Sequence, residues 1–343
     1  MSEDRGSKRM GFGKTAEAAS DCHQDHQEEG GRFPFPFAGR KARRPGKGFG
    51  SLSVCRLWVQ ALWTAISNGY AAGFLNGRIY TGKTKSACAP GLNCYSCPGA
   101  LFACPIGALQ AVISSRQFTF SCYVFGFLMV LGSLFGRMIC GWFCPFGLAQ
   151  DLLYKLPLMK KKRRLLGDRY LRWVKYVILA VFVLILPAVV VNVAGIGSPW
   201  FCKYICPSGT LMGGIPLLLA NPGLREAAGV LFGWKAFLLI VVVLLSIRMP
   251  RPFCRYVCPL GAMYGLFNPV SIFRFKLEAD KCISCGQCRR ACPMDIKVYE
   301  HPNSMECIRC GACIEACPTR AVRASFIRTG ACKKENGGAV RGS

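Results

Sequence analysis

The run Cys282-x2-Cys285-x2-Cys288-x3-Cys292-Pro293 is repeated with the same spacing as Cys307-x2-Cys310-x2-Cys313-x3-Cys317-Pro318. In such doubled runs the first three thiolates wrap around one iron–sulfur cluster, and the fourth ligates the other cluster. The spacing therefore predicts two [4Fe–4S] sites, one formed by Cys282, Cys285, Cys288 and Cys317 and the other by Cys307, Cys310, Cys313 and Cys292. Zinc knuckles or a disulfide framework are the alternatives. Zinc sites usually separate their Cys pairs by longer loops and often include His, whereas only His301 lies in this stretch, outside both runs.

The composition indicates a membrane protein. The 343 residues could form two domains, and 52% hydrophobic residues together with a net charge of +27 suggest membrane spans with basic flanks. The 22 cysteines would form disulfides only in an oxidising compartment, and the sequence opens with no apolar signal segment. Residues 1–50 and 323–343 are polar and basic, so we expect both to be disordered tails, the first of them cytoplasmic.

Four weakly charged stretches are expected to cross a membrane, which takes about 20 mostly apolar residues in a helix. They are Leu57 to Leu75, the window between Arg116 and Arg137, Tyr176 to Gly197, and about Gly229 to Ile247. The last contains Lys235, which we expect to snorkel to the nearer interface. Basic residues concentrate between the second and third stretches and at both ends of the chain, which predicts that both termini are cytoplasmic. We attribute the positive charge to this topology and not to nucleic-acid binding.

A second cysteine pattern, Cys-x3-Cys-Pro-x-Gly, adjoins the apolar stretches. It occurs three times, as Cys140-Gly-Trp-Phe-Cys144-Pro-Phe-Gly147, Cys202-Lys-Tyr-Ile-Cys206-Pro-Ser-Gly209 and Cys254-Arg-Tyr-Val-Cys258-Pro-Leu-Gly261, and a related version is Cys94-Tyr-Ser-Cys97-Pro98 followed by Cys104-Pro-Ile-Gly107. Proline after the second cysteine can open a helix at its first position. A thiolate held there feels the positive end of the helix dipole, which favours the charged ligand form.

The order of these motifs predicts an internal duplication, in which each half reads span, outer motif, span, inner motif. Packed face to face, the halves would bring four cysteines together on the inner side: Cys140, Cys144, Cys254 and Cys258. Five would meet on the outer side, one more than a cubane needs: Cys94, Cys97, Cys104, Cys202 and Cys206. The sequence leaves open which of the five is not a ligand. Arg137, Lys203, Arg251 and Arg255 either stabilise cluster charge or anchor the chain at the interface. The alternative for the cysteines is that they are small buried packing residues.

These motifs resemble the membrane-bound polyferredoxins of the NapH, NosR and CcoG type. The resemblance rests on Gly136-Arg137-x2-Cys140-Gly-Trp-x-Cys144-Pro-Phe-Gly147, Arg251-Pro-Phe-Cys254-Arg-Tyr-Val-Cys258-Pro-Leu-Gly261 and the doubled ferredoxin run, and it covers about Arg56 to Arg320. It implies electron transfer to or from a membrane partner. NosR-like members also carry a flavin-binding domain with a Ser/Thr-Gly-Ala-Thr motif. This sequence has no such motif, so it resembles the subgroup without that domain, and a flavin would belong to another subunit.

We therefore expect an α-helical multi-pass membrane protein with about four transmembrane helices. The membrane domain spans residues 51–272, and a C-terminal α+β ferredoxin domain of the bacterial 2[4Fe–4S] type spans residues 273–322. The predicted function is electron transfer in the cytoplasmic membrane, between a cytoplasmic partner and a membrane or extracytoplasmic one, such as a flavoprotein or a quinone-linked complex. Two alternatives are a metal-reducing or cofactor-maturation factor and a redox sensor. The sequence has no nucleophile, general-base pair or nucleotide loop, so an electron-transfer subunit is favoured over a self-contained enzyme.

Overall fold

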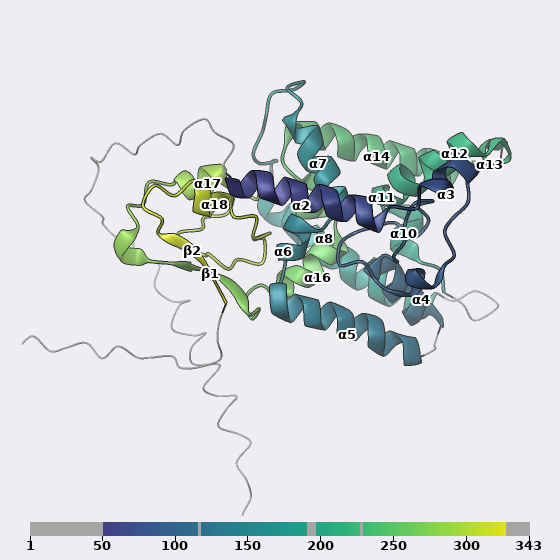
Figure 1. Ribbon diagram of the computed structural model, residues 1–343, viewed down its shortest axis with the longest axis horizontal. Helices are drawn as coiled ribbons and strands as arrows, with labels where there is room; N and C mark the ends of the chain where they lie inside the picture. The colour runs from purple at the N-terminus through teal and green to yellow at the C-terminus, as the bar shows by residue number, and fades with distance from the viewer. Residues whose placement is uncertain (1–50, 116–117, 191–196, 227–228, 327–343) are drawn as a thin grey trace, which may run out of the picture. The chain divides into compact units, whose positions relative to one another are not determined.

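The computed structural model describes residues 51–326 except 116–117, 191–196 and 227–228. The predicted N-terminal tail and most of the C-terminal one lie outside these residues. The helices of the described part (Figure 1) are α2 (Ser51–Ser67), α3 (Ala71–Asn76), η1 (Lys83–Ser86), α4 (Pro105–Ser115), α5 (Phe118–Phe135), α6 (Met138–Trp142), α7 (Pro145–Lys155), α8 (Asp168–Ile178), η2 (Leu179–Ile185), α9 (Leu186–Val189), α10 (Trp200–Tyr204), α11 (Pro207–Gly209), η3 (Thr210–Gly214), α12 (Ile215–Ala220), α13 (Pro222–Glu226), α14 (Val230–Arg248), α15 (Pro252–Tyr256), α16 (Pro259–Phe267), η4 (Ala279–Lys281), α17 (Gln287–Ala291) and α18 (Ala312–Glu315).

Two helices of the described part are long and apolar enough to cross a membrane. One is continuous through α8, η2 and α9, from Asp168 to Val189 with 22 residues, and the other is α14 with 19 residues. They correspond to the third and fourth predicted spans, although the third helix begins eight residues before the predicted Tyr176. By length and apolar composition, both are suited to cross a membrane.

The other two predicted spans fold as α2 and α5, of 17 and 18 residues. Helix α2 ends at Ser67, eight residues before the predicted boundary. Its last turn is closed by the side chain of Asn68, which donates a hydrogen bond to the carbonyl of Thr64 at 3.1 Å. A short α3 follows after a break at Gly69. The polar residues near the end of this apolar stretch therefore terminate the helix.

The Cys-Pro step of each Cys-x3-Cys-Pro-x-Gly motif opens a helix, as the sequence predicts. Cys144 and Cys258 are the N-cap residues of α7 and α16, with Pro145 and Pro259 in the first helical position. Helices α4 and α11 begin in the same way, directly after Cys104 and Cys206. Proline suits this position because its missing N–H would have no partner inside the helix. Figure 1 shows α6 and α16 toward the end that carries the two strands, and α4, α10 and α11 toward the other end.

The C-terminal part is built on a two-stranded antiparallel sheet. Strand β1 (Phe273–Leu277) pairs with β2 (Val322–Phe326), with Phe273 opposite Phe326. The two cysteine runs between the strands have the same backbone conformation, because their equivalent residues adopt left-handed φ angles. Ser284 and Arg309 both have φ of 49°, and Gly286 and Gly311 have φ of 68° and 78°. The doubled sequence run is therefore a doubled loop structure.

Buried and partly buried hydrogen bonds attach this ferredoxin-like part to the helices. The indole of Trp142 donates to the carbonyl of Arg309 at 3.1 Å, and the amide of Asn268 donates to the carbonyl of Cys307 at 2.7 Å. The guanidinium of Arg309 reaches back to the carbonyl of Phe135 at 2.9 Å. Because these partners satisfy one another away from water, the second cysteine run is held against the helical part.

Candidate iron–sulfur centres

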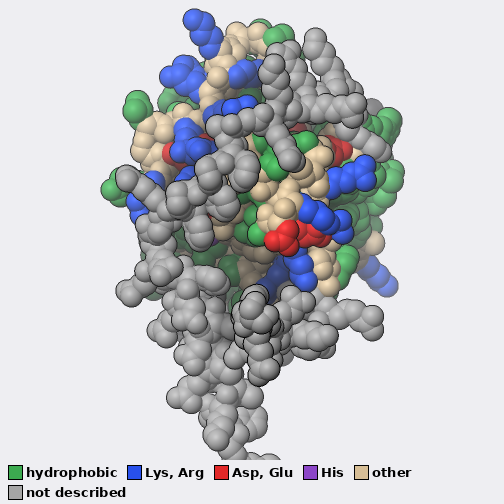
Figure 2. All heavy atoms as spheres, turned by 90° about the vertical axis from the view of Figure 1, so that its left-hand side faces the viewer, with side chains coloured by type: hydrophobic (Ala, Val, Ile, Leu, Met, Phe, Trp, Pro, Cys, Tyr) green, Lys and Arg blue, Asp and Glu red, His purple; other side chains and the backbone are tan. Residues whose placement is uncertain are grey.

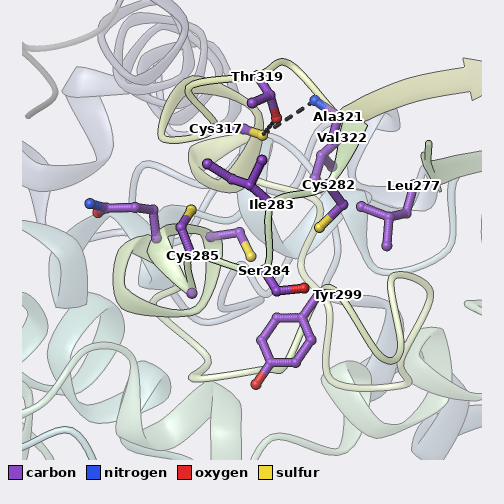
Figure 3. Close-up of a pocket in the computed structure, with 13 residues that line it drawn as sticks. Leu277, Cys282, Ile283, Ser284, Cys285, Tyr299, Cys317, Thr319, Ala321 and Val322 are labelled. Carbon is purple, nitrogen blue, oxygen red and sulfur yellow. Dashed lines mark hydrogen bonds between the residues drawn. The ribbon is translucent and has the colours of Figure 1, made fainter. Parts of the chain in front are cut away.

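The first predicted cluster site is a cavity lined by its four cysteines. Cys282, Cys285, Cys288 and Cys317 all border one cavity, and Figure 3 shows labelled cysteines of this set around it. We call this set the distal centre. Burial opposes ionisation of Cys317, but hydrogen bonds from Thr319 and from the backbone of Ala321 outweigh it and lower its pKa. This favours the thiolate form that binds iron.

The second predicted set, which we call the proximal centre, is also gathered in space. It consists of Cys292, Cys307, Cys310 and Cys313. Burial, with the nearby thiolates of Cys292 and Cys310, raises the pKa of Cys307 to about 12. Burial and the thiolates of Cys307 and Cys310 likewise raise the pKa of Cys313. Burial is the larger cause, and the thiolates act on one another because these cysteines lie close together; a bound cation would favour their charged form.

The inner set comes together from two Cys-x3-Cys-Pro-x-Gly motifs, one running from α6 into α7 and the other from α15 into α16. Burial and the thiolates of Cys254 and Cys140 raise the pKa of Cys144 to about 12, and the same neighbours raise that of Cys258. We call Cys140, Cys144, Cys254 and Cys258 the inner centre. The sulfur of Cys144 accepts a hydrogen bond from the backbone of Gly147, and that of Cys258 accepts one from Gly261, both at 3.4 Å.

Two buried arginines cross between the halves of the inner centre. Arg251, three residues before Cys254, donates to the carbonyl of Cys140 at 2.6 Å. Arg137, three residues before Cys140, donates to the carbonyl of Cys254. A Cβ at Gly147 would lie 3.4 Å from the guanidinium carbon of Arg251, and a Cβ at Gly261 would lie 3.1 Å from a guanidinium nitrogen of Arg137. The glycine of each motif thus leaves room for the arginine of the other half.

Carboxylates hold both arginines in place. Asp151 accepts two hydrogen bonds from Arg251, at 2.7 and 2.6 Å, and pairs with Arg56 at 3.1 Å. Glu306 accepts from Arg137 at 2.9 Å and also pairs with Lys175. Burial alone would raise the pKa of Asp151, but Arg251 and Arg56 outweigh that effect and lower it. Glu306 directly precedes Cys307, so one ion-pair network connects the inner and proximal centres.

Four of the five outer cysteines come together. Burial, then the thiolates of Cys206, Cys104 and Cys94, raise the pKa of Cys202 well above its usual value. Burial and the thiolates of Cys206 and Cys94 raise that of Cys104 to about 12. The thiol of Cys97 is different, because the principal charged groups acting on its pKa, after burial, are Cys94 and Lys85. We call Cys94, Cys104, Cys202 and Cys206 the outer centre.

Sequence reasoning missed two glutamines that support the centres in the same way. Gln110 donates to the sulfur of Cys202 at 3.4 Å and accepts from the backbone of Phe201 at 3.1 Å. Gln150 donates to the sulfur of Cys254 at 3.3 Å and accepts from the backbone of Phe253 at 3.2 Å. Each glutamine is the sixth residue after a Cys-Pro cysteine, so Cys-Pro-x-Gly-x-x-Gln was the signal in the sequence.

The predicted basic residues divide into two groups. Arg137 and Arg251 lie beside the inner centre, as described above. Arg255 instead pairs with Asp168 at 2.8 Å, and the ammonium of Lys203 lies 5.2 Å from the ring of Tyr204. Lys235 belongs with the outer centre: a Cβ at Gly209 would lie 3.8 Å from its ammonium and 3.6 Å from the sulfur of Cys94. This lysine therefore reaches the cysteines from within an apolar helix.

The donor set fits iron–sulfur clusters. Each centre offers four thiols, and Arg137 carries a buried Nε that has no hydrogen-bond partner in the described part of the chain, while its charge acts against burial to lower the pKa of Cys140. No group of three or more His, Cys, Asp or Glu close enough to hold a single metal ion occurs among the described residues. When bound, such clusters would supply one-electron transfer, with potentials that depend on burial, nearby charge and hydrogen bonds to sulfur.

Comparison with protein families agrees with this chemistry. A family described as "4Fe-4S binding domain" matches residues 117–165, 179–220 and 231–279, and one described as "4Fe-4S dicluster domain" matches residues 274–318. The first match covers all three Cys-x3-Cys-Pro-x-Gly motifs in full, and the second contains the doubled ferredoxin run. No solved structure matches the chain.

Several curated proteins are similar over about half of this chain. Two uncharacterized proteins of Methanocaldococcus jannaschii are 35% and 34% identical, over 52% of this chain in each case and over 60% and 68% of their own lengths. The ferredoxin-type protein NapH of Haemophilus influenzae is 28% identical over 49% of this chain and 50% of its own length. The match thus spans half to about two thirds of the length of these relatives.

Proposed function

This chain belongs to the family of ferredoxin-type iron–sulfur proteins that includes NapH, and we propose that it conducts electrons across a membrane through four [4Fe–4S] clusters. As a member of this family it is an iron–sulfur protein of electron transfer. The proposal goes further, in that it assigns one cluster to each of the distal, proximal, inner and outer centres. The clusters would carry the redox chemistry, and the chain would set their positions, burial and potentials.

The ligand assignment follows the cysteine groups. We assign Cys282, Cys285, Cys288 and Cys317 to the distal cluster, Cys292, Cys307, Cys310 and Cys313 to the proximal one, and Cys140, Cys144, Cys254 and Cys258 to the inner one. For the outer cluster we infer Cys94, Cys104, Cys202 and Cys206, and Cys97 is the residue left over. The matched roles of Gln110 and Gln150 support both the outer assignment and the proposed duplication.

The contact between Gly141 and the second ferredoxin loop carries the proposal. A Cβ at Gly141 would lie 2.5 Å from the carbonyl oxygen of Ile308 and 3.9 Å from the Cα of Cys310. Gly141 follows Cys140 in the chain, so the proximal and inner centres meet at this point. Such an approach of two backbones is possible only where one residue has no side chain.

A short stretch of chain connects the inner and outer centres. The backbone amide of Leu92 hydrogen-bonds the sulfur of Cys144, and two residues later Cys94 belongs to the outer centre. Two residues span at most about 7 Å of extended chain, so the step between these centres is short. Tyr264, fully buried, also lies between them: burial and the thiolates of Cys140, Cys88 and Cys104 raise its pKa well above the usual value.

The solvent exposure of the cysteines supports a path that begins at the distal centre. The distal cysteines are partly exposed, whereas the inner ones are buried, so a soluble partner would meet the distal centre first. We propose that this end is cytoplasmic, that both termini lie on that side, and that α2 and α5 complete four spans with the two long helices. The basic segment between α7 and α8 supports this orientation. The partners would be redox proteins, such as a flavoprotein or a quinone-linked complex.

Iron content and electron paramagnetic resonance test the proposal. Protein purified without oxygen should contain about 16 iron atoms per chain, four for each cluster. After stepwise reduction it should show four separable one-electron centres. About 8 iron atoms, with signals from two centres only, would restrict the clusters to the ferredoxin-like part and refute the transmembrane path.

A further inference from the structure

A cleft lies where the ferredoxin-like part meets the helices, and the centres described above do not fill it. Its volume is about 290 Å³, near the lower end for small-molecule sites. One wall comes from α2 and α7 and the other from α17 and α18. Cys292 and Cys310, two of the proximal cysteines, form part of the lining. A molecule in the cleft would therefore touch the ligands of the proximal centre.

The charged residues around the cleft favour binding of an anion. Its lining includes the basic side chains of Arg56, Lys155, Arg163 and Arg290 and only two carboxylates, Asp151 and Asp295. Asp151 pairs with Arg56 of the lining and with Arg251 outside it, and Asp295 pairs with Arg164 and Arg289, which are not part of the lining. Because both carboxylates are compensated by these arginines, Arg163 and Arg290 give the lining an excess of positive charge.

The other lining residues suit a flat ring. Leu57, Pro250 and Pro293 supply apolar surface, and Tyr154 supplies an aromatic ring. The ammonium of Lys161 lies 4.0 Å from the centre of that ring and adds another positive charge nearby. Figure 2, which views this end of the molecule, shows many Lys and Arg side chains and few acidic ones among the atoms it colours.

We propose that this cleft binds a small, anionic, ring-containing electron carrier, which exchanges electrons with the proximal centre directly. The inference rests on the proposed function and adds an entry point that bypasses the distal centre. The dihydro form of such a carrier gives up two electrons and two protons. The electrons enter two clusters in succession, and the protons pass to water through the open side of the cleft.

The experiment uses the full protein in nanodiscs of zwitterionic lipid. The probe is anthraquinone-2,6-disulfonate, a flat redox dye with two negative charges, and methyl viologen is the comparison dye with two positive charges. The test variant is the double change Arg163→Gln and Arg290→Gln, both of them exposed side chains. Lys276→Gln is the matched control, because Lys276 is exposed on β1 and is not part of the cleft.

The double variant should bind the oxidised disulfonate about tenfold more weakly, because two exposed ion pairs with the dye are lost. Its clusters should be reduced more slowly by the reduced disulfonate, and at the wild-type rate by reduced methyl viologen. Lys276→Gln should behave like the wild type in all three measurements. Unchanged binding or unchanged reduction by the disulfonate in the double variant would overturn the proposal.

Two further arms separate the remaining explanations. Nanodiscs with phosphatidylglycerol test whether the basic residues hold lipid headgroups. If this lipid abolishes binding of the disulfonate, the cleft is a headgroup site and the proposal is wrong; binding retained in both lipids supports it. If reduced methyl viologen reduces only two clusters in the wild type, the transmembrane path fails instead, and disulfonate binding still decides the cleft.

Discussion

Replacing Gly141 by alanine should loosen the contact between the proximal and inner centres. The added Cβ would lie 2.5 Å from the carbonyl oxygen of Ile308, so one backbone must retreat by about 0.5 to 1 Å to reach an ordinary contact. Overpacking of this kind costs about 2 kcal/mol. Alanine in place of glycine also stabilises the helix α6 by about 0.6 kcal/mol, because glycine is unfavourable inside a helix.

The net effect of about 1.4 kcal/mol makes opening of this contact about tenfold more frequent. Hydrogen exchange of the backbone amides of Ile308 to Cys310 reports that opening directly. We expect exchange about tenfold faster in Gly141→Ala, with the iron content unchanged and reduction of the inner centre slower. Gly126→Ala on α5 is the control, because a Cβ there has nothing within 4 Å.

Exchange within about twofold of the wild type in Gly141→Ala would refute the reasoning. It would mean that the two parts of the chain do not approach each other as closely as this contact requires. Faster exchange in both glycine variants would point to a general loss of stability, and the specific contact would then lose its support.

Three further outcomes follow from the same contacts. Cys97→Ser should keep its full iron content, whereas Cys94→Ser should lose about four iron atoms per chain; equal losses would contradict the outer assignment. Asp151→Asn should destabilise the protein by about 3 kcal/mol near pH 7, since it leaves a buried arginine unpaired, while Asp280→Asn at an exposed site should not. The lowered pKa of Asp151 means that its contribution is complete above about pH 4 and is lost as the pH falls through that lowered value; urea unfolding at several pH values measures this, and a difference that persists at low pH would be inconsistent with it. Arg137→Gln should lower the midpoint potential of the inner centre in a redox titration, because it removes a positive charge that stabilises the reduced form, and an unchanged potential would show that this arginine is structural only.

Local sequence determined the features that depend on spacing along the chain. The doubled cysteine run predicted two four-cysteine groups, and the structure gathers both of them, because three of the four thiols in each group lie within one short loop. The Cys-Pro steps predicted helix starts at Pro145 and Pro259, since proline and the helix dipole act over a single turn. The apolar stretches located α14 to within a residue at each end.

The sequence could not place the first span correctly. Its apolar character continues past Ser67, yet the helix stops there. Gln60, inside this apolar stretch, is fully buried and donates to the carbonyl of Cys144 at 2.7 Å. The sequence alone does not show that Gln60 is a buried hydrogen-bond donor, because its partner lies 84 positions away in the chain.

Tertiary structure alone decided the groupings that join distant segments. The sequence left open which of the five outer cysteines is not a ligand, and only the folded chain shows that Cys94, Cys104 and Cys206, but not Cys97, are the principal charges acting on Cys202. The exchange of Arg137 and Arg251 between the two inner motifs likewise joins residues more than 100 positions apart. Spacing along the chain determines which thiols can lie in one loop. Which loops lie together depends on the whole fold, because buried charged and polar groups need partners that come from distant parts of the chain.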